Sequence, residues 1–102
     1  MNNAGRMLCG FVDEVASEDE ASLMRVNVLA PASLAKAVLL QFRKQNGAGY
    51  IVQLGSVLGS LNNPSTSCYN ASKAAAMVCI YIITLYNTTF RELKFLSVRF
   101  FV

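Results

Sequence analysis

Histidine and tryptophan are absent from this 102-residue sequence, and charged residues make up only 15% of it. The three cysteines, Cys9, Cys68 and Cys79, are odd in number and show no Cys-x-x-Cys spacing. Without histidine partners, they give a zinc site or a disulfide framework little support. The sequence therefore predicts no metal and a reducing compartment, with the cytoplasm as the expected location.

A secretory signal and a dense basic cluster are also missing. The net charge of +3 comes from scattered lysines and arginines, which argues against nucleic-acid binding. The most apolar stretch, residues 74–85, is shorter than the roughly 20 residues of a membrane span. It predicts a buried or interface helix and leaves weak membrane association open.

Apolar residues are plentiful: they form 54% of the chain, and the mean hydropathy is +0.40. The length suits one small domain, and a domain of this size usually carries more charge on its large relative surface. We therefore expect apolar faces that the rest of a larger domain, or a partner, covers.

The first half of the chain predicts a polar turn and two helical pieces. Residues 2–5 form the turn. Ser17 and Glu20 have the spacing of a capping box at a helix start. Pro31 predicts a break near residues 27–31. The second piece is expected to end near Lys44, with an apolar stripe formed by Leu34, Val38, Leu39 and Phe42.

The second half predicts a strand, a helix and a strand. Residues 50–54 are mostly apolar and partly β-branched, which is typical of a buried parallel strand. Residues 55–67 are small and turn-rich, a helix is expected over about 69–85, and a last strand over 95–102. This order predicts parallel strands joined by a right-handed crossover.

Tyr69 and Lys73 carry the clearest chemical signal. Four residues apart on a helix, they share one face. A nearby ammonium favours the phenolate, so the phenol can exchange a proton with a carbonyl or alcohol oxygen. Ser56 follows the apolar strand, where functional groups gather in open parallel sheets. Its hydroxyl could hydrogen-bond the same oxygen as charge develops.

Each signal also has an ordinary structural explanation. A Tyr-x-x-x-Lys pair occurs easily by chance on a solvated helix face. Asn27 could simply satisfy backbone groups at a helix break, Ser56 could belong to a strand-to-loop turn, and residues 3–5 could be a plain turn. Taken one at a time, none of these residues predicts a function.

The order and spacing of the motifs resemble the short-chain dehydrogenase/reductase family. Asn2-Asn3-Ala4-Gly5 resembles that family's turn after its fourth strand, and Val26-Asn27-Val28 its long-helix asparagine. Residues 51–59 resemble the strand that ends in the active-site serine, here Ser56. Residues 69–73 match the Tyr-x-Ala-Ser-Lys form of its Tyr-x-x-x-Lys motif.

The resemblance implies a role for each of these residues. Tyr69 would be the general acid/base, and Lys73 would favour its phenolate and hold the nicotinamide ribose hydroxyls. Ser56 would orient the substrate oxygen, and Asn27 would hold a water in a proton relay to Lys73. Three further residues would line the adenosine side of the cofactor site: Asn3, Ala4 and Gly5.

The implied reaction is hydride transfer between NAD(P)H and a small-molecule carbonyl or alcohol. The particular residues within these motifs resemble those of a lipid-metabolic branch of the family. This branch includes NADPH-dependent 1-acyldihydroxyacetone-phosphate reductases. That branch favours NADP(H) over NAD(H). It also adds the endoplasmic reticulum or a lipid-droplet surface as an alternative location.

The chain departs from the family in lacking the glycine-rich Thr-Gly-x-x-x-Gly-x-Gly loop for the cofactor's phosphates. The expected fold is therefore a single incomplete α/β domain over residues 1–102. It is a partial Rossmann-like, doubly wound parallel sheet without the N-terminal cofactor-binding βαβ half. Little activity and doubtful cofactor binding are expected of this chain alone. The alternative is a non-catalytic family fragment that acts at most as an interaction module.

Residues 77–90 depart from the family as well, because they are apolar and β-branched where an amphipathic helix is usual. One hypothesis is that they derive from an unspliced intron or a gene-model error. The other is a buried helix that packs across a two-fold interface and makes the protein a homo-oligomer.

Overall fold

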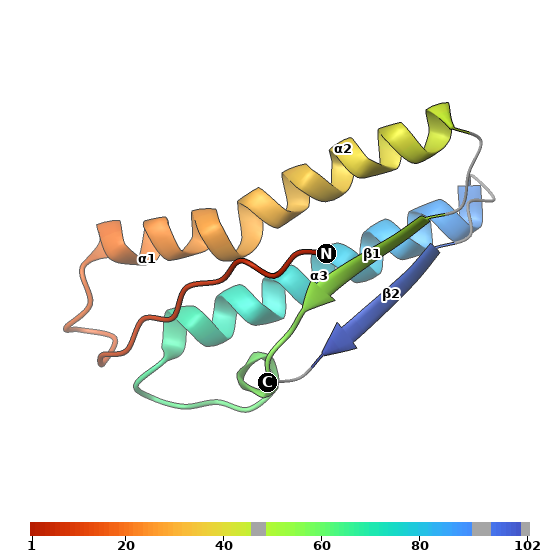
Figure 1. Cartoon of the computed structure of the whole chain (residues 1–102). Coiled ribbons are helices and arrows are strands. Elements are labelled where there is room, and N and C mark those ends of the chain that lie inside the picture. The colour runs from red at the N-terminus through yellow and green to blue at the C-terminus, as the bar shows by residue number, and fades with distance from the viewer. Residues whose placement is uncertain (46–48, 91–94, 101–102) are drawn as a thin grey trace.

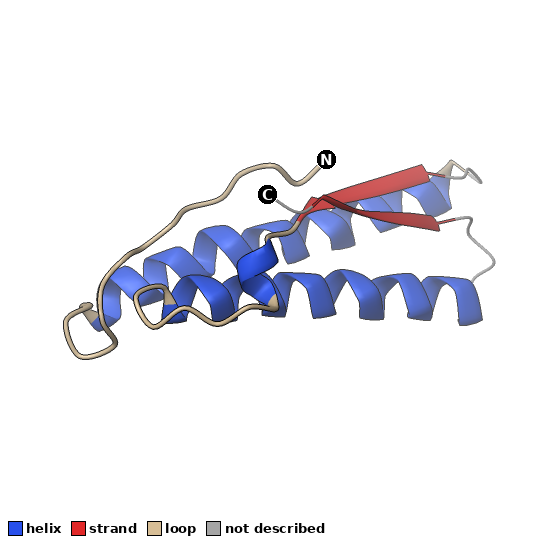
Figure 2. Cartoon of the chain, turned by 90° about the horizontal axis from the view of Figure 1, so that it is seen from below, coloured by secondary structure: helices blue, strands red, loops and turns tan. Residues whose placement is uncertain are grey.

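The computed structural model describes residues 1–45, 49–90 and 95–100. Its described part is elongated, with principal extents of 49 × 23 × 20 Å. Two long helical rods lie side by side in one layer, and a small sheet covers one side of that layer (Figures 1 and 2). The paired strands and helices form part of a Rossmann-like α/β fold, as predicted.

The first rod is continuous from Ser17 to Lys44. It consists of α1 (Ser17–Met24), a π-helical segment η1 (Arg25–Leu29) and α2 (Ala30–Lys44). The predicted break at residues 27–31 is wrong, since the rod remains helical and only its hydrogen-bond pattern widens over η1. Pro31 is the second residue of α2, directly after η1, and the rod continues through it.

The start of α1 also differs from the prediction. Its N-cap is Ala16, whose carbonyl accepts hydrogen bonds from the amides of Asp19 and Glu20, and no side chain caps it. Ser17 is instead the first helical residue. The acidic residues of this first turn interact favourably with the helix dipole, which supports the helix start without a side-chain cap.

The sheet pairs β1 (Gly49–Leu54) with β2 (Phe95–Phe100) in parallel register, from Gly49 opposite Phe95 to Leu54 opposite Phe100. Both strands and their parallel pairing are as predicted, and residues 101 and 102 of the second predicted strand lie outside the described residues. Between them run η2 (Val57–Gly59), a short 3₁₀ turn, and α3 (Ser67–Phe90). The crossover helix α3 is longer than the predicted 69–85.

Asn2 lies on the other side of β1 and does not form a simple polar turn. Its amide donates to the Val52 carbonyl at 2.6 Å, and its carbonyl accepts from the Leu54 amide at 3.1 Å. This parallel bridge places β1 between Asn2 and β2. The following residues, 3–5, therefore leave the sheet at the carboxyl end of β1.

The core lies where α2 and α3 pack against β1. It contains Ala35, Leu39, Ile51 and Ile80, with Phe42 and Ile83 packed against it. The predicted stripe on α2 is wrong at Leu34, which is 58% exposed, and at Val38, which is 36% exposed. Ala35 takes the buried position, because a small side chain lets α2 approach its neighbours.

Residues 77–90 continue α3 as a regular helix despite their β-branched content. Ile80 is buried in the core, which agrees with the buried-helix hypothesis for this segment. Other apolar side chains of the same segment are exposed: Val78, Tyr81, Ile82 and Leu85.

By length and composition, the helical stretch Ser17–Lys44 is apolar enough to cross a membrane. This is not the stretch that the sequence singled out. The core helix of a soluble protein passes the same test, and this one contributes buried residues to the core.

Candidate active site

Tyr69 and Lys73 lie one turn apart near the start of α3. Lys73 is only 8% exposed, and its Nζ lies 5.7 Å from the centroid of the Tyr69 ring. The same Nζ donates a hydrogen bond of 3.3 Å to the carbonyl of Leu54, the last residue of β1. The ammonium thus lies between the phenol ring and the carboxyl end of the central strand.

Ser56 lies two residues beyond that carbonyl and is 4% exposed. Its Oγ accepts a hydrogen bond of 3.2 Å from the Leu58 amide, which starts the η2 turn. At the end of η2, a Cβ added to Gly59 would lie 3.3 Å from backbone and Cβ atoms of Lys73 and Ala74. Glycine at this position therefore lets the serine's turn lie directly against the helix that carries Lys73.

Asn27 projects from the π-helical segment and is 3% exposed. Its Oδ1 accepts from the Arg6 amide at 2.7 Å, and its Nδ2 donates to the Arg6 carbonyl at 2.8 Å. Nδ2 also donates to Ser72 Oγ at 3.0 Å. The asparagine side chain thus connects residue 6, the long helical rod and α3.

Of the three predicted cofactor-lining residues, Gly5 comes closest to the lysine. A Cβ at Gly5 would lie 3.5 Å from Lys73 Nζ and 3.8 Å from Asn27 Oδ1. The structure therefore brings Gly5, Asn27 and Lys73 together. Asn3 and Ala4 are exposed and border a small hollow against α2, which places them at the outer edge of this cluster.

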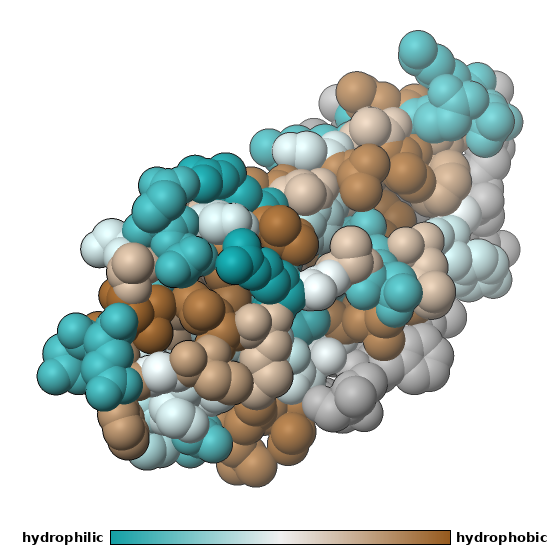
Figure 3. All heavy atoms as spheres, turned by 60° about the vertical axis from the view of Figure 1, so that its left-hand side comes forward, coloured by the Kyte–Doolittle hydropathy of each residue, from teal (hydrophilic) through white to brown (hydrophobic). Residues whose placement is uncertain are grey.

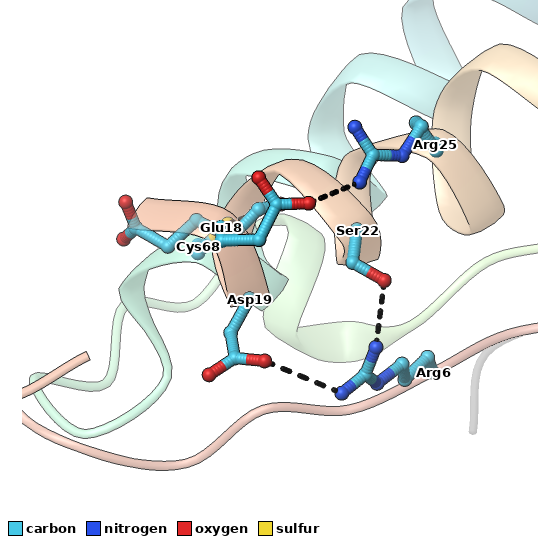
Figure 4. Close-up of polar contacts among 7 residues, drawn as sticks. Arg6, Glu18, Asp19, Ser22, Arg25 and Cys68 are labelled. Atoms are coloured by element: carbon cyan, nitrogen blue, oxygen red, sulfur yellow. Dashed lines mark hydrogen bonds and ion pairs between the residues drawn. The ribbon is translucent and has the colours of Figure 1, made fainter. Parts of the chain in front are cut away.

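The sequence analysis missed Arg6. Its side chain holds the segment that contains Gly5 against α1. Its guanidinium donates to Ser22 Oγ at 2.8 Å and lies 3.8 Å from the Asp19 carboxylate, both on α1 (Figure 4). A second ion pair joins Arg25 to Glu18 at 2.7 Å. Nothing in the sequence marked Arg6 beyond its place directly after the Asn-Asn-Ala-Gly motif.

Buried polar groups surround the start of α3. Thr66 Oγ1 donates to Asn70 Oδ1 at 2.9 Å, and both residues are buried. Asn70 also lines a hollow of about 500 Å³ beside residues 59–64. Asn70 follows Tyr69 by one residue, about a quarter turn of helix, so this hollow lies on a different face of α3 from Tyr69 and Lys73.

The site fits one part of a nicotinamide cofactor. A buried ammonium beside a phenol, close to the exposed Gly5, suits the hydroxyl-rich ribose next to the nicotinamide ring, because hydroxyls accept from an ammonium without adding charge. Phosphate groups need backbone amides from a glycine-rich loop, and the 102 residues contain no such loop. The residues present therefore fit the sugar, and the cofactor's phosphates find no matching loop among them.

Comparison with known proteins identifies the family. The family model for short chain dehydrogenases matches residues 1–84. An uncharacterized oxidoreductase of Thermotoga maritima is 39% identical over 77 residues, which are 76% of this chain and 30% of that protein. The chain belongs to the short-chain dehydrogenase/reductase family, and it spans about a third or less of the length of the curated relatives it matches.

Solved structures give the same result at the level of the fold. A short chain dehydrogenase from Mycobacterium smegmatis superposes with a TM-score of 0.86 at 26% identity, over 98% of this chain and 41% of that one. A gluconate 5-dehydrogenase from Burkholderia cenocepacia J2315, in complex with NADP and tartrate, superposes with a TM-score of 0.80 at 25% identity. That match covers 96% of this chain and 38% of the dehydrogenase.

Proposed function

We propose that this chain supplies the catalytic residues of an NAD(P)H-dependent oxidoreductase that reduces a carbonyl or oxidises an alcohol. The cofactor, when bound, supplies or accepts the hydride. The chain's own residues handle the proton and orient the substrate. During reduction, Tyr69 donates its hydroxyl proton to the substrate oxygen as negative charge develops there. Ser56 donates a hydrogen bond to the same oxygen.

The buried Lys73 is the observation that carries this proposal. Burying an ammonium is costly unless it is paired or used. In the described part of the chain, the two ion pairs join Arg6 to Asp19 and Arg25 to Glu18, and Lys73 belongs to neither. Its described partners are a neutral carbonyl and an aromatic ring. A cation in such surroundings keeps its remaining donors for a ligand.

The role of Asn27 in a proton relay and the preference for one cofactor are more specific proposals. Both hydrogens of Nδ2 are already donated, so a relay water would have to bind Oδ1 or a backbone group. Two proposals rest on the particular residues of the motifs alone: the preference for NADP(H), and acyl-dihydroxyacetone phosphate as the substrate. A competition assay with acyl-dihydroxyacetone phosphate and simple ketones tests the lipid substrate. If the enzyme shows no preference for acyl-dihydroxyacetone phosphate, that proposal is wrong.

A chimaera tests the proposed activity. The gluconate 5-dehydrogenase would keep its own cofactor-binding half and receive residues 1–102 in place of its equivalent 38%. Cofactor binding is followed by NADPH fluorescence. Turnover is followed by absorbance with gluconate and with a panel of ketones. Turnover that disappears in Tyr69→Phe supports the proposal. A folded chimaera that binds NADPH without Tyr69-dependent turnover overturns it.

The isolated 102-residue polypeptide provides a second test. Without a glycine-rich phosphate loop, it is expected to bind NADPH too weakly to detect by fluorescence titration. Tight binding would show that other backbone amides of this chain hold the phosphates. The cytoplasmic location stays a prediction, and flotation with liposomes would distinguish it from attachment to a membrane surface.

The exposed apolar side chains on α3 support a second proposal, that the chain forms homo-oligomers. One of them, Ile82, borders a groove between α3 and α2 that is lined by Lys36, Leu39, Leu40, Arg43, Ile82 and Ile83. Ile82 is 57% exposed, which is unfavourable for an isolated molecule when many such residues gather. Ile82→Glu is expected to reduce self-association in light scattering, with Tyr50→Glu on the sheet as a matched control. Equal masses for all three proteins at every concentration would contradict it.

A further inference from the structure

Ser72 is fully buried, and its hydroxyl lies between two groups from different parts of the chain. Oγ donates to the Tyr69 carbonyl at 2.7 Å within α3. The same oxygen accepts from Asn27 Nδ2 at 3.0 Å, across 45 positions of sequence. In the part of the chain that the structure describes, this bond directly joins the rod that holds Asn27 to the helix that holds Tyr69 and Lys73.

The direction of these hydrogen bonds is determined by chemistry. Nδ2 carries only donors, so Ser72 Oγ must accept from it and turn its own proton to the Tyr69 carbonyl. The Asn27 amide cannot be flipped, because Oδ1 would then face two acceptors: the Arg6 carbonyl, and Ser72 Oγ with its proton already donated. All three hydrogen bonds of Asn27 and both of Ser72 are thus consistent with a single arrangement.

This chain of bonds leads from the catalytic turn of α3 to the space beside the lysine. Ser72 holds Asn27, and Asn27 holds both backbone groups of Arg6. Arg6 directly follows Gly5, whose Cα faces Lys73 Nζ. We infer that Ser72 is a positioning residue. It sets the distance between the Tyr69–Lys73 turn and the segment at Gly5, and so the width of the space in which a cofactor sugar would lie.

An ordinary explanation competes with this inference, since helical serines often donate to the carbonyl three residues back. Such a bond needs no partner on another element. Under the ordinary explanation, removing the hydroxyl changes stability alone. Under the positioning role, it also releases Asn27 and changes the turnover number.

The inference rests on the proposed function, and its experiment separates the two. In the chimaera, Ser72→Ala is expected to lower kcat roughly ten-fold, because a small misplacement of reacting groups is costly, while the KM for the carbonyl substrate changes little. In the 102-residue chain, the same change should shift the side-chain amide resonances of Asn27. A parent chimaera without Tyr69-dependent turnover would sink the proposed function. An active parent with an unchanged kcat in Ser72→Ala would sink the positioning role.

Thr66→Val is the matched control. It removes a buried hydroxyl at the start of the same helix while keeping the side-chain shape, and Thr66 contacts Asn70 instead of Asn27. It should lower thermal stability about as much as Ser72→Ala and leave kcat within two-fold of the parent. An equal loss of kcat in both variants would overturn the inference.

Ser72→Cys covers the case in which Ser72→Ala fails to fold. The thiol is close in size to the hydroxyl but is a weaker donor and acceptor. An intermediate kcat, together with a smaller shift of the Asn27 amide resonances, supports the positioning role. A Ser72→Cys variant with full kcat overturns it.

Discussion

The two halves of α3 reverse the usual placement of polar and apolar residues. The amino-terminal half buries Asn70, Ser72 and Lys73, whereas the carboxyl-terminal half exposes Ile82 and Leu85. Burying polar groups stabilises little and demands partners, so it indicates a built site. Exposing large apolar groups indicates a surface that another chain or segment covers. One helix thus carries the candidate site near one end and exposed apolar side chains near the other.

Apolar side chains also reach the surface elsewhere on the molecule. On the face in Figure 3, brown apolar atoms lie between hydrophilic ones. Exposed examples outside α3 include Phe11, Val12 and Leu61. An elongated shape with a one-sided sheet has too little interior to cover them. The excess apolar content of the sequence therefore appears at the surface and only partly in the core.

The largest effect should come from the phenol in the amino-terminal half. In the chimaera, Tyr69→Phe removes the proton donor and keeps the ring, and turnover should fall by about 10²-fold or more. Tyr81→Phe makes the same change in the carboxyl-terminal half and should leave turnover within two-fold. Spectrophotometric assays of both variants test the contrast, and similar losses for the two would erase it.

The next effect concerns stability within the carboxyl-terminal half. Ile80 is 3% exposed in the core, so Ile80→Ala should lower the free energy of unfolding by about 2–4 kcal/mol. Ile82 is exposed, and Ile82→Ala should change that free energy by less than about 0.5 kcal/mol in the monomer. Urea denaturation at low protein concentration measures both. A large loss for Ile82→Ala would mean that its side chain is covered even in the monomer.

Substitutions at the two glycines beside Lys73 should distinguish an effect on packing from an effect on cofactor binding. Gly59→Ala places its Cβ against backbone at 3.3 Å, so α3 must shift, at a cost of about 1 kcal/mol or more. Gly5→Ala meets the flexible end of Lys73 at 3.5 Å, so stability should hardly change while cofactor affinity in the chimaera weakens. Denaturation curves and NADPH titration together check the pair, and a reversed pattern would contradict the described site.

The smallest effect is a difference in thiol reactivity. Burial and, secondarily, the nearby Glu20 carboxylate raise the pKa of the Cys68 thiol above its ordinary value of 9.0. The thiol also contacts the Glu20 carbonyl on α1 at 3.8 Å, and Figure 4 shows it beside that helix. Iodoacetamide reacts with the thiolate, so Cys68 should react several-fold more slowly than the exposed Cys9 at pH 8.

The raised pKa of Cys68 also determines the direction in which stability changes with pH. Below the ordinary value, the thiol keeps its proton in the folded and unfolded chains alike, and its contribution is fully present. Above about pH 9, the unfolded chain loses the proton first, so stability falls as pH rises. Cys68→Ser should flatten this fall in thermal melts at pH 8–10. An unchanged slope would assign the fall to other groups.

Much of the fold could be predicted because its signals are local. The strand at 50–54 and the helix end at Lys44 follow from short apolar runs and glycines. The errors at Leu34 and Val38 arise because a stripe on a helix shows its spacing but not which side faces the sheet. The prediction of a break at residues 27–31 was wrong because it was based on Pro31, whereas the rod continues there as a π-helical segment.

Of the candidate site, the sequence identified the residue types and missed their connections. Tyr69, Lys73, Ser56 and Asn27 stood out by motif, and the family they indicated is confirmed by the match over residues 1–84. Their individual roles stay predictions. Arg6 and Ser72 drew no separate attention, because a hydrogen bond between positions 27 and 72 has no signature along the chain.

The sequence by itself determined the family, the strand and helix types, and the presence of a phenol and an ammonium on one helix face, because these depend on side chains a few positions apart. Only the tertiary structure decided that Lys73 lies at the end of β1, that the Asn27 amide hydrogen-bonds Arg6 and Ser72, and that Ile82 faces outward. Those outcomes depend on how distant segments satisfy buried polar groups and share a limited apolar interior.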